Sequence, residues 1–230
     1  MIYINEILEK RCIIDGEMEL AKNIMNKRNI SNYFNKEHKI QDKMILERLS
    51  DIAFIKKVKR HEILVKQGEV PKYLLFQIKG IVGGYYVDEK GKYHMELFSG
   101  QYKLPIAATY HQNDISPVTL EALTKGEIII VPKEAFRELS EAEPELMKVS
   151  VYMLLEALAL QTELKRVLLY YDVKKRYEWF VREYPELNGK ISNRYVASFL
   201  NMTPETLSRV KKELQREEGS DSRTSEIQSQ

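Results

Sequence analysis

The spacing of hydrophobic residues changes along the chain, and each pattern predicts a different kind of structure. Residues 1–40 mix short apolar stretches with asparagine, lysine and glutamate, which we interpret as a helical extension at the N-terminus. From Ile40 to Val58 the apolar residues recur at helical spacing, which predicts one helix there. Beyond Glu62 this spacing gives way to much shorter apolar runs.

The segment from Glu62 to Pro132 consists of short apolar runs that end at turn signals. Two of these turns are Gln67-Gly68-Glu69 and Asp88-Glu89-Lys90-Gly91. Many short strands joined by glycine-containing turns are typical of a β-sandwich or a jelly-roll barrel. Because no helical runs alternate with these strands, the pattern disfavours a parallel α/β sheet. We therefore predict an α+β fold with a jelly-roll β-barrel domain over residues 41–143.

A single long helix is predicted over residues 144–184. Pro144 suits the first turn of a helix, and no glycine or further proline follows up to Glu183. Residues 151–160 are apolar almost all round, so the helix must be covered on more than one side. We propose the barrel and a second subunit as its neighbours; the alternative is the central core helix of a monomer. A seven-residue repeat resembles a short coiled-coil dimer seam, comprising Met147, Leu154, Ala157, Gln161, Leu164, Leu168 and Tyr171.

A pair of short helices joined by a tight turn is predicted within residues 185–216. Ser192 is a plausible N-cap of the first helix, and Thr203 followed by Pro204 is a favoured start for the second. Small and apolar residues at matching positions form a shared core, as in a helix-turn-helix. The outward face of the second helix is polar and can reach base edges in a major groove. The alternative is a helical hairpin with a solvated polar face.

The net charge is only +2, which conceals an uneven distribution. Residues 185–216 carry six basic and three acidic side chains, whereas residues 217–230 carry four acidic side chains and one arginine. We interpret residues 217–230 as a disordered acidic tail. The single cysteine, Cys12, excludes an internal disulfide framework, a zinc ribbon and a four-cysteine iron–sulfur site. With no long apolar run and no signal-peptide pattern, we expect no membrane span and a cytoplasmic location.

The order of these parts resembles the Crp/Fnr family of bacterial transcription regulators over roughly residues 41–214. The most specific segment is ISNRYVASFLNMTPETLSRVKKEL, and the barrel adds Gly68-Glu69 and Lys79-Gly80 at familiar spacing. The resemblance implies a cyclic-nucleotide-binding-like barrel, a dimerisation helix and a helix-turn-helix domain. It also implies a homodimer on pseudo-palindromic double-stranded DNA, RNA polymerase as a further partner, no enzymatic activity and no cofactor.

The resemblance assigns roles to the second helix of the helix-turn-helix. Family members read bases with a glutamate and an arginine four residues apart, and Glu205 and Arg209 match that pair, with Ser208 between them. Glutamate accepts a hydrogen bond from cytosine N4, and arginine pairs with guanine O6 and N7. Pro204 stands where many members have another arginine. The residues expected to contact the DNA backbone are Ser192, Arg194, Thr203, Thr206, Lys211 and Lys212.

The residues with which some family members bind cyclic nucleotides are not matched in this sequence. Members that bind cyclic nucleotides use a Gly-Glu pair for the ribose and an Arg-Ser or Arg-Thr pair for the phosphate. Gln101 stands near the expected glutamate, and Ser116-Pro117 lies near the expected Arg-Ser. Without that arginine the phosphate loses its charge-assisted anchor, so we predict no control by cyclic AMP. The barrel aromatics are most simply core and rim residues; otherwise a pocket for an unknown small-molecule effector is lined by Tyr85, Phe98, Gln101 and Tyr102.

Two alternative functions are a metal-dependent enzyme and a ligand-sensing module without DNA binding. A jelly-roll barrel is also the fold of metal-dependent cupin enzymes, which need clustered histidine and carboxylate ligands. No His-x-His pair occurs, and His94 and His111 are well separated, so we predict no metal site. The other alternative is a ligand-sensing module without DNA binding. The intact helix-turn-helix core and the Glu205/Arg209 pair argue against it.

Overall fold

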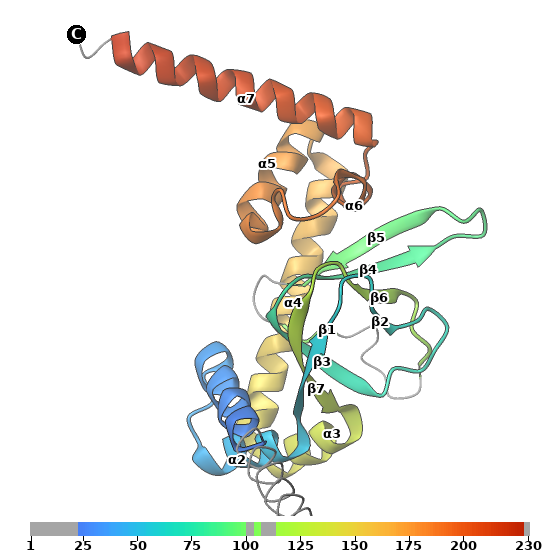
Figure 1. Ribbon diagram of the computed structural model, residues 1–230, viewed down its shortest axis with the longest axis vertical. Coiled ribbons are helices and arrows are strands. Elements are labelled where there is room, and N and C mark those ends of the chain that lie inside the picture. The colour runs from blue at the N-terminus through green and yellow to red at the C-terminus, as the bar shows by residue number, and fades with distance from the viewer. Residues whose placement is uncertain (1–22, 100–103, 107–113, 228–230) are drawn as a thin grey trace, which may run out of the picture.

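The structure is a computed structural model that describes residues 23–99, 104–106 and 114–227, with side chains described up to residue 217. It consists of a β-barrel with helices at both ends (Figure 1). The predicted α+β class and the order of barrel, long helix and C-terminal helices are confirmed. Besides a helical segment over residues 23–38, the helices are α2 (Lys43–Ile52), α3 (Lys133–Ala142), α4 (Pro144–Tyr170), α5 (Val173–Glu183), the 3-10 helix η1 (Pro185–Leu187), α6 (Asn193–Phe199) and α7 (Pro204–Ile227).

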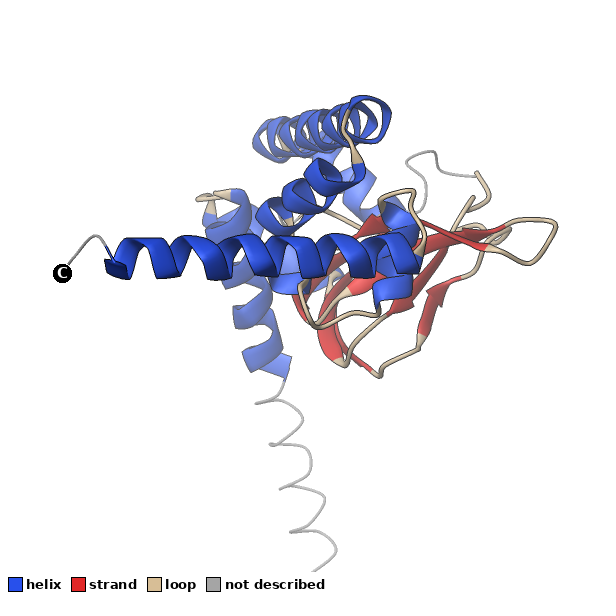
Figure 2. Cartoon of the chain, turned by 90° about the horizontal axis from the view of Figure 1, so that it is seen from above, coloured by secondary structure: helices blue, strands red, loops and turns tan. Residues whose placement is uncertain are grey.

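The described strands form two antiparallel sheets. One sheet has the order β1-β7-β3, and the other has the order β2-β6-β4-β5, so that β5 lies at an edge. Figure 2 shows the strands (red) gathered on one side of the molecule. Gly68, Gly80 and Gly91 adopt positive φ angles in turns, as glycine readily does. The strands are β1 (Phe54–Val58), β2 (Ile63–Val65), β3 (Tyr73–Lys79), β4 (Val82–Val87), β5 (Tyr93–Phe98), β6 (Thr119–Ala122) and β7 (Gly126–Pro132).

The sequence pattern predicted one helix over residues 40–58, and this prediction is wrong. Helix α2 ends at Ile52, Ala53 is extended, and β1 begins at Phe54, which pairs with Ile130 of β7. Short apolar runs fit both a helix and a buried strand, so the pairing with β7 decides the outcome. The helix start is marked by Asp42, whose carboxylate accepts the N–H groups of Met44 and Ile45.

Part of the N-terminal extension belongs to the core. Residues 23–38 are helical, and Ile30, Phe34 and Ile40 are at most 1% exposed. They pack with Phe76 and Ile129 on the outer side of the β1-β7-β3 sheet. The described part of the extension is therefore integral to the barrel domain and not an appendage.

The predicted single helix over residues 144–184 is two helices. Helix α4 ends at Tyr170, Tyr171 is extended, and α5 begins at Val173. The carboxylate of Asp172 accepts the N–H of Lys175 at 2.9 Å and so caps the second helix. Aspartate is a strong N-cap, and it breaks the helix here although neither glycine nor proline is present.

The C-terminal residues also differ from expectation. The segment interpreted as a disordered tail from residue 217 continues α7 up to Ile227. A helix that is already nucleated extends by one hydrogen bond per residue, and no proline follows Pro204 to stop it. Lys174 of α5 also pairs with Glu217 at 2.7 Å and ties this part of α7 to the neighbouring helix.

Candidate nucleic-acid interface

Helices α6 and α7 form the predicted helix-turn-helix. The hydroxyl of Ser192 accepts the N–H of Arg194 at 3.3 Å, and that of Thr203 accepts the N–H of Thr206 at 3.2 Å, so both helices have side-chain N-caps. Asn201 adopts a φ of 51°, a left-handed conformation that asparagine tolerates, and this closes the turn between the helices.

The inner faces of α6 and α7 are closed against each other. Ala197 is fully buried where the helices approach, and its carbonyl accepts the N–H of Met202 at 2.9 Å. The other core residues, each at most 3% exposed, are Val196, Leu200, Leu207 and Val210. The polar residues of α7 must therefore face outward.

The three proposed base-reading residues lie on the exposed face of α7. Glu205, Ser208 and Arg209 are all exposed, and their spacing of three and four residues places them side by side. Hydrogen bonds from its own backbone N–H and from Thr203 hold the pKa of the Glu205 carboxyl below its usual range. Glu205 is thus an ionised acceptor, as pairing with a cytosine amino group requires.

The proposed backbone-contacting residues have structural partners as well. The guanidinium of Arg194 lies 4.8 Å from the ring centroid of Tyr93 in β5. Lys211 donates to Asn193 at 2.7 Å and lies over the Tyr177 ring, and burial lowers its pKa. Lys212 is exposed, whereas Thr206 is half-buried. Lys211 therefore bridges helices, while the exposed Arg194 and Lys212 are better placed to meet a phosphate.

Helix α6 docks on the edge of the barrel. The hydroxyl of Ser198 accepts the N–H of Met95 at 2.9 Å and donates to the carbonyl of Tyr93 at 3.2 Å. Beside it, the rings of Phe98 and Phe199 have centroids 4.9 Å apart. Because β5 is an edge strand, Ser198 satisfies backbone groups that the sheet leaves unpaired.

Two of the four residues proposed to line a ligand pocket lie in this junction. Tyr85 and Phe98 are 7% and 6% exposed and belong to a core shared by the barrel and the C-terminal helices. Burial and a hydrogen bond with Glu121 raise the pKa of Tyr85. The side chains of Tyr85 and Phe98 therefore pack in the contact between the barrel and the C-terminal helices. Gln101 and Tyr102 lie outside the described residues.

The proposed dimer seam on α4 divides into two parts. Met147 and Leu154 are 42% and 49% exposed, Gln161 is exposed and Ala157 is half-buried. By contrast, Leu164 is only 8% exposed. Together with Leu168 and Tyr171 it packs into the core shared with the C-terminal helices. The end of the predicted seam is thus used within the chain, because α5 turns back after Asp172. The large apolar residues that stay exposed on α4 are Met147, Val151, Tyr152, Leu154, Leu155, Leu158, Leu169 and Tyr170.

Comparison with known proteins agrees with this architecture. The sequence profile of the cyclic nucleotide-binding domain matches residues 55–143. The match covers most of the barrel and helix α3. No curated protein matches the sequence significantly.

Solved structures extend the likeness beyond the cyclic nucleotide-binding domain. FixK2 from Bradyrhizobium japonicum has a TM-score of 0.65 at 16% identity, over 72% of this chain and 86% of that chain. A transcriptional regulator of the Crp/Fnr family from Eubacterium rectale has 0.62 at 17%, over 81% and 88%. CLP of Xanthomonas campestris, a regulator responsive to c-di-GMP, has 0.60 at 18%, over 76% and 93%. The chain therefore has the fold of the Crp/Fnr regulators, as the sequence motifs predicted.

The barrel holds a buried serine where the phosphate-binding arginine and serine are expected. Ser116 is 1% exposed, and its hydroxyl donates to the carbonyl of Val118. Pro117, which follows it, offers no cation. The described part of the chain thus has no Arg-Ser or Arg-Thr pair at this position.

The histidines of the described residues are used in local contacts. His61 pairs with the buried Glu121 at 2.6 Å, and His94 pairs with Asp88 at 2.8 Å. His38 packs among aromatic rings, and burial lowers its pKa to about 4. Within the described ranges no three His, Cys, Asp or Glu side chains are placed to hold a metal ion. Cys12 and His111 lie outside them. No sequence pattern indicates the His61–Glu121 and His94–Asp88 pairs, since each joins residues of different strands or turns.

None of the helices in the described segments is both long and apolar enough to cross a bilayer.

Proposed function

We propose that this protein is a sequence-specific DNA-binding transcription regulator of the Crp/Fnr type and not an enzyme. The observation that carries the proposal is the exposed face of α7, where Glu205, Ser208 and Arg209 project from a helix-turn-helix with a buried core. The fold shared with transcription regulators supports it. A cytoplasmic location and contact with RNA polymerase follow from this role.

The test is selection of binding sites from random duplex DNA by the full chain. We expect enrichment of one short palindromic sequence, with a cytosine or guanine in each half-site that Glu205 and Arg209 read. If the selection enriches no sequence, the proposal is contradicted and the alternative, a ligand-sensing module without DNA binding, explains the protein better.

A homodimer is the second part of the proposal. The exposed apolar residues of α4, among them Val151, Leu155 and Leu158, form a stripe of the kind that marks an interface. A second copy would cover this stripe and place two recognition helices about 34 Å apart, one turn of DNA. Light scattering should give twice the chain mass of 27.0 kDa. A mass of one chain at micromolar concentration would contradict the dimer.

The third part is regulation that does not use cyclic AMP. The buried Ser116 and the absence of an arginine beside it support this view, because a cyclic phosphate needs a charged anchor. A ligand that binds the folded state raises the melting temperature by mass action. We expect cyclic AMP at millimolar concentration to leave it unchanged, and a saturable increase would contradict the proposal.

A further inference from the structure

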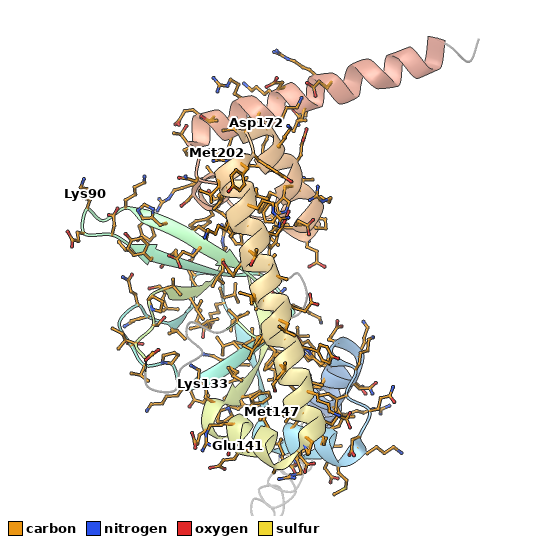
Figure 3. All side chains as sticks on the ribbon, turned by 180° about the vertical axis from the view of Figure 1, so that it is seen from behind. Lys90, Lys133, Glu141, Met147, Asp172 and Met202 are labelled. Atoms are coloured by element: carbon orange, nitrogen blue, oxygen red, sulfur yellow. The ribbon has the colours of Figure 1, made fainter. Side chains whose placement is uncertain are left out.

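The β4–β5 hairpin of the barrel lies beside the start of α7, and the two enclose a cleft of about 660 Å³. One wall is formed by the hairpin, from Gly91 to His94, and the other by Arg194, Ser198 and the turn from Asn201 to Pro204. Figure 3 shows Lys90 at the tip of the hairpin, on the same side of α4 as Met202 in the turn before α7. A barrel element therefore adjoins the surface proposed to bind DNA.

The charged side chains that line this cleft are basic. Lys92 and Arg194 line it, and no acidic side chain does so within the described part of the chain. The carboxylate of Asp88 in the hairpin already has hydrogen-bond partners. It bonds His94 at 2.8 Å and accepts the N–H groups of Lys90 and Lys92 at 2.9 Å each. The cleft thus suits an anion.

The ammonium group of Lys92 is available to such an anion. Lys92 is exposed, and Nζ makes no hydrogen bond or ion pair with any described residue. Its backbone is nevertheless fixed, because its N–H bonds Asp88 and its carbonyl accepts the N–H of Asp88 at 3.0 Å. The side chain therefore extends from a rigid turn.

We propose that this cleft binds the phosphodiester backbone of DNA and that Lys92 of the barrel supplies a phosphate contact beside Arg194. The proposal rests on the proposed function, because it continues the surface that Arg194 and Thr203 form on the helix-turn-helix. The barrel is then part of the DNA-binding surface. Its position relative to the helix-turn-helix is fixed by the bonds of Ser198 to β5.

The test measures affinity for the selected duplex against salt concentration. Each phosphate contact contributes about 0.9 to the slope of log affinity against log salt. Lys92→Gln should reduce the slope by about 0.9 for each bound protomer and weaken binding to selected and scrambled duplexes by the same factor. Lys92→Arg keeps the charge and should retain the slope. Lys43→Gln, an exposed lysine of α2 at the opposite end of α4, should also leave it unchanged.

The outcomes separate this inference from the proposed function. If the unaltered protein binds its palindrome and Lys92→Gln has the same salt slope, the cleft does not hold the backbone and the inference fails alone. A slope reduced equally by Lys43→Gln would also overturn it, since the effect would then reflect net charge. If the unaltered protein binds no duplex, both fail.

Discussion

The aromatic contact between the barrel and the C-terminal helices offers a sharp test of how the two parts are joined. Phe98 of β5 is 6% exposed, and its ring lies 4.9 Å from that of Phe199 in α6. The rings of Phe180 and Tyr184 lie 6.1 and 6.3 Å away. Phe98→Ala therefore removes a barrel ring whose own aromatic partners all belong to the C-terminal part of the chain.

The size of the effect follows from burial and ring contacts. Truncating a buried phenylalanine to alanine costs about 3–5 kcal/mol, and aromatic pairing contributes about 0.5–1.5 kcal/mol beyond area burial. We expect about 3 kcal/mol here, because the facing rings belong to one helical unit that can settle toward the gap. With a urea m value of about 2.5 kcal/mol/M, the unfolding midpoint falls by about 1.2 M.

The assay can use a built-in reporter of this junction. Trp179 is the only tryptophan, is 1% exposed, and lies 5.8 Å from Tyr184 in the same cluster. Its fluorescence reports the junction, while far-UV circular dichroism reports the whole fold. In the unaltered protein the two transitions should coincide.

The control for Phe98→Ala is the same change at an exposed ring. Phe54 of β1 is 48% exposed, so Phe54→Ala should cost about 1 kcal/mol. A midpoint shift for Phe98→Ala no larger than that for Phe54→Ala would refute the reasoning, because the C-terminal helices would then not depend on the barrel for their stability.

Three further predictions concern other parts of the molecule. Arg209→Ala should weaken binding to the selected duplex by about 1–3 kcal/mol and relax specificity at one base pair, whereas Arg216→Ala, later on α7, should not change the selected sequence. Leu158→Glu should halve the mass measured by light scattering if the 64% exposed Leu158 lies in a dimer interface, and an unchanged mass would exclude it from that interface. The pKa of His38 is lowered to about 4 by burial, against 6.5 in an unfolded chain, so only the unfolded state takes up this proton between those values. Stability should therefore be intact above pH 6.5 and fall by up to about 2 kcal/mol by pH 5 in urea titrations, and His38→Leu should flatten that fall.

Local signals in the sequence predicted the helix-turn-helix well. Caps at Ser192 and Thr203, a proline at position 204 and apolar residues at helical spacing all act within one turn of helix. Such signals need no knowledge of distant residues. The strands of the barrel were found for the same reason, since glycine turns such as that at Gly91 mark where each strand ends.

Features that depend on distant partners were missed. Periodicity alone assigned Leu164, Leu168 and Tyr171 to a dimer seam, yet they pack against the chain's own C-terminal helices. Apolar spacing does not say which surface will cover a residue. The break at Asp172 had a local signal, an aspartate cap, but the absence of glycine and proline from residues 145–183 favoured one continuous helix. The helical continuation of α7 beyond residue 217 was missed because a polar composition indicates that a segment is solvated and does not determine its backbone conformation.

The contacts of α6 explain why one small helix can link the two parts of the molecule. Its inner face, with Ala197, packs on α7, while Ser198 and Phe199, which follow directly, contact β5 of the barrel. A helix of seven residues has too little surface to move past both neighbours independently. Any shift of the β4–β5 hairpin must therefore carry α6 with it, and α6 in turn carries the residues of α7 proposed to read bases. The position of the hairpin thus determines the orientation of the α7 surface that is proposed to bind DNA.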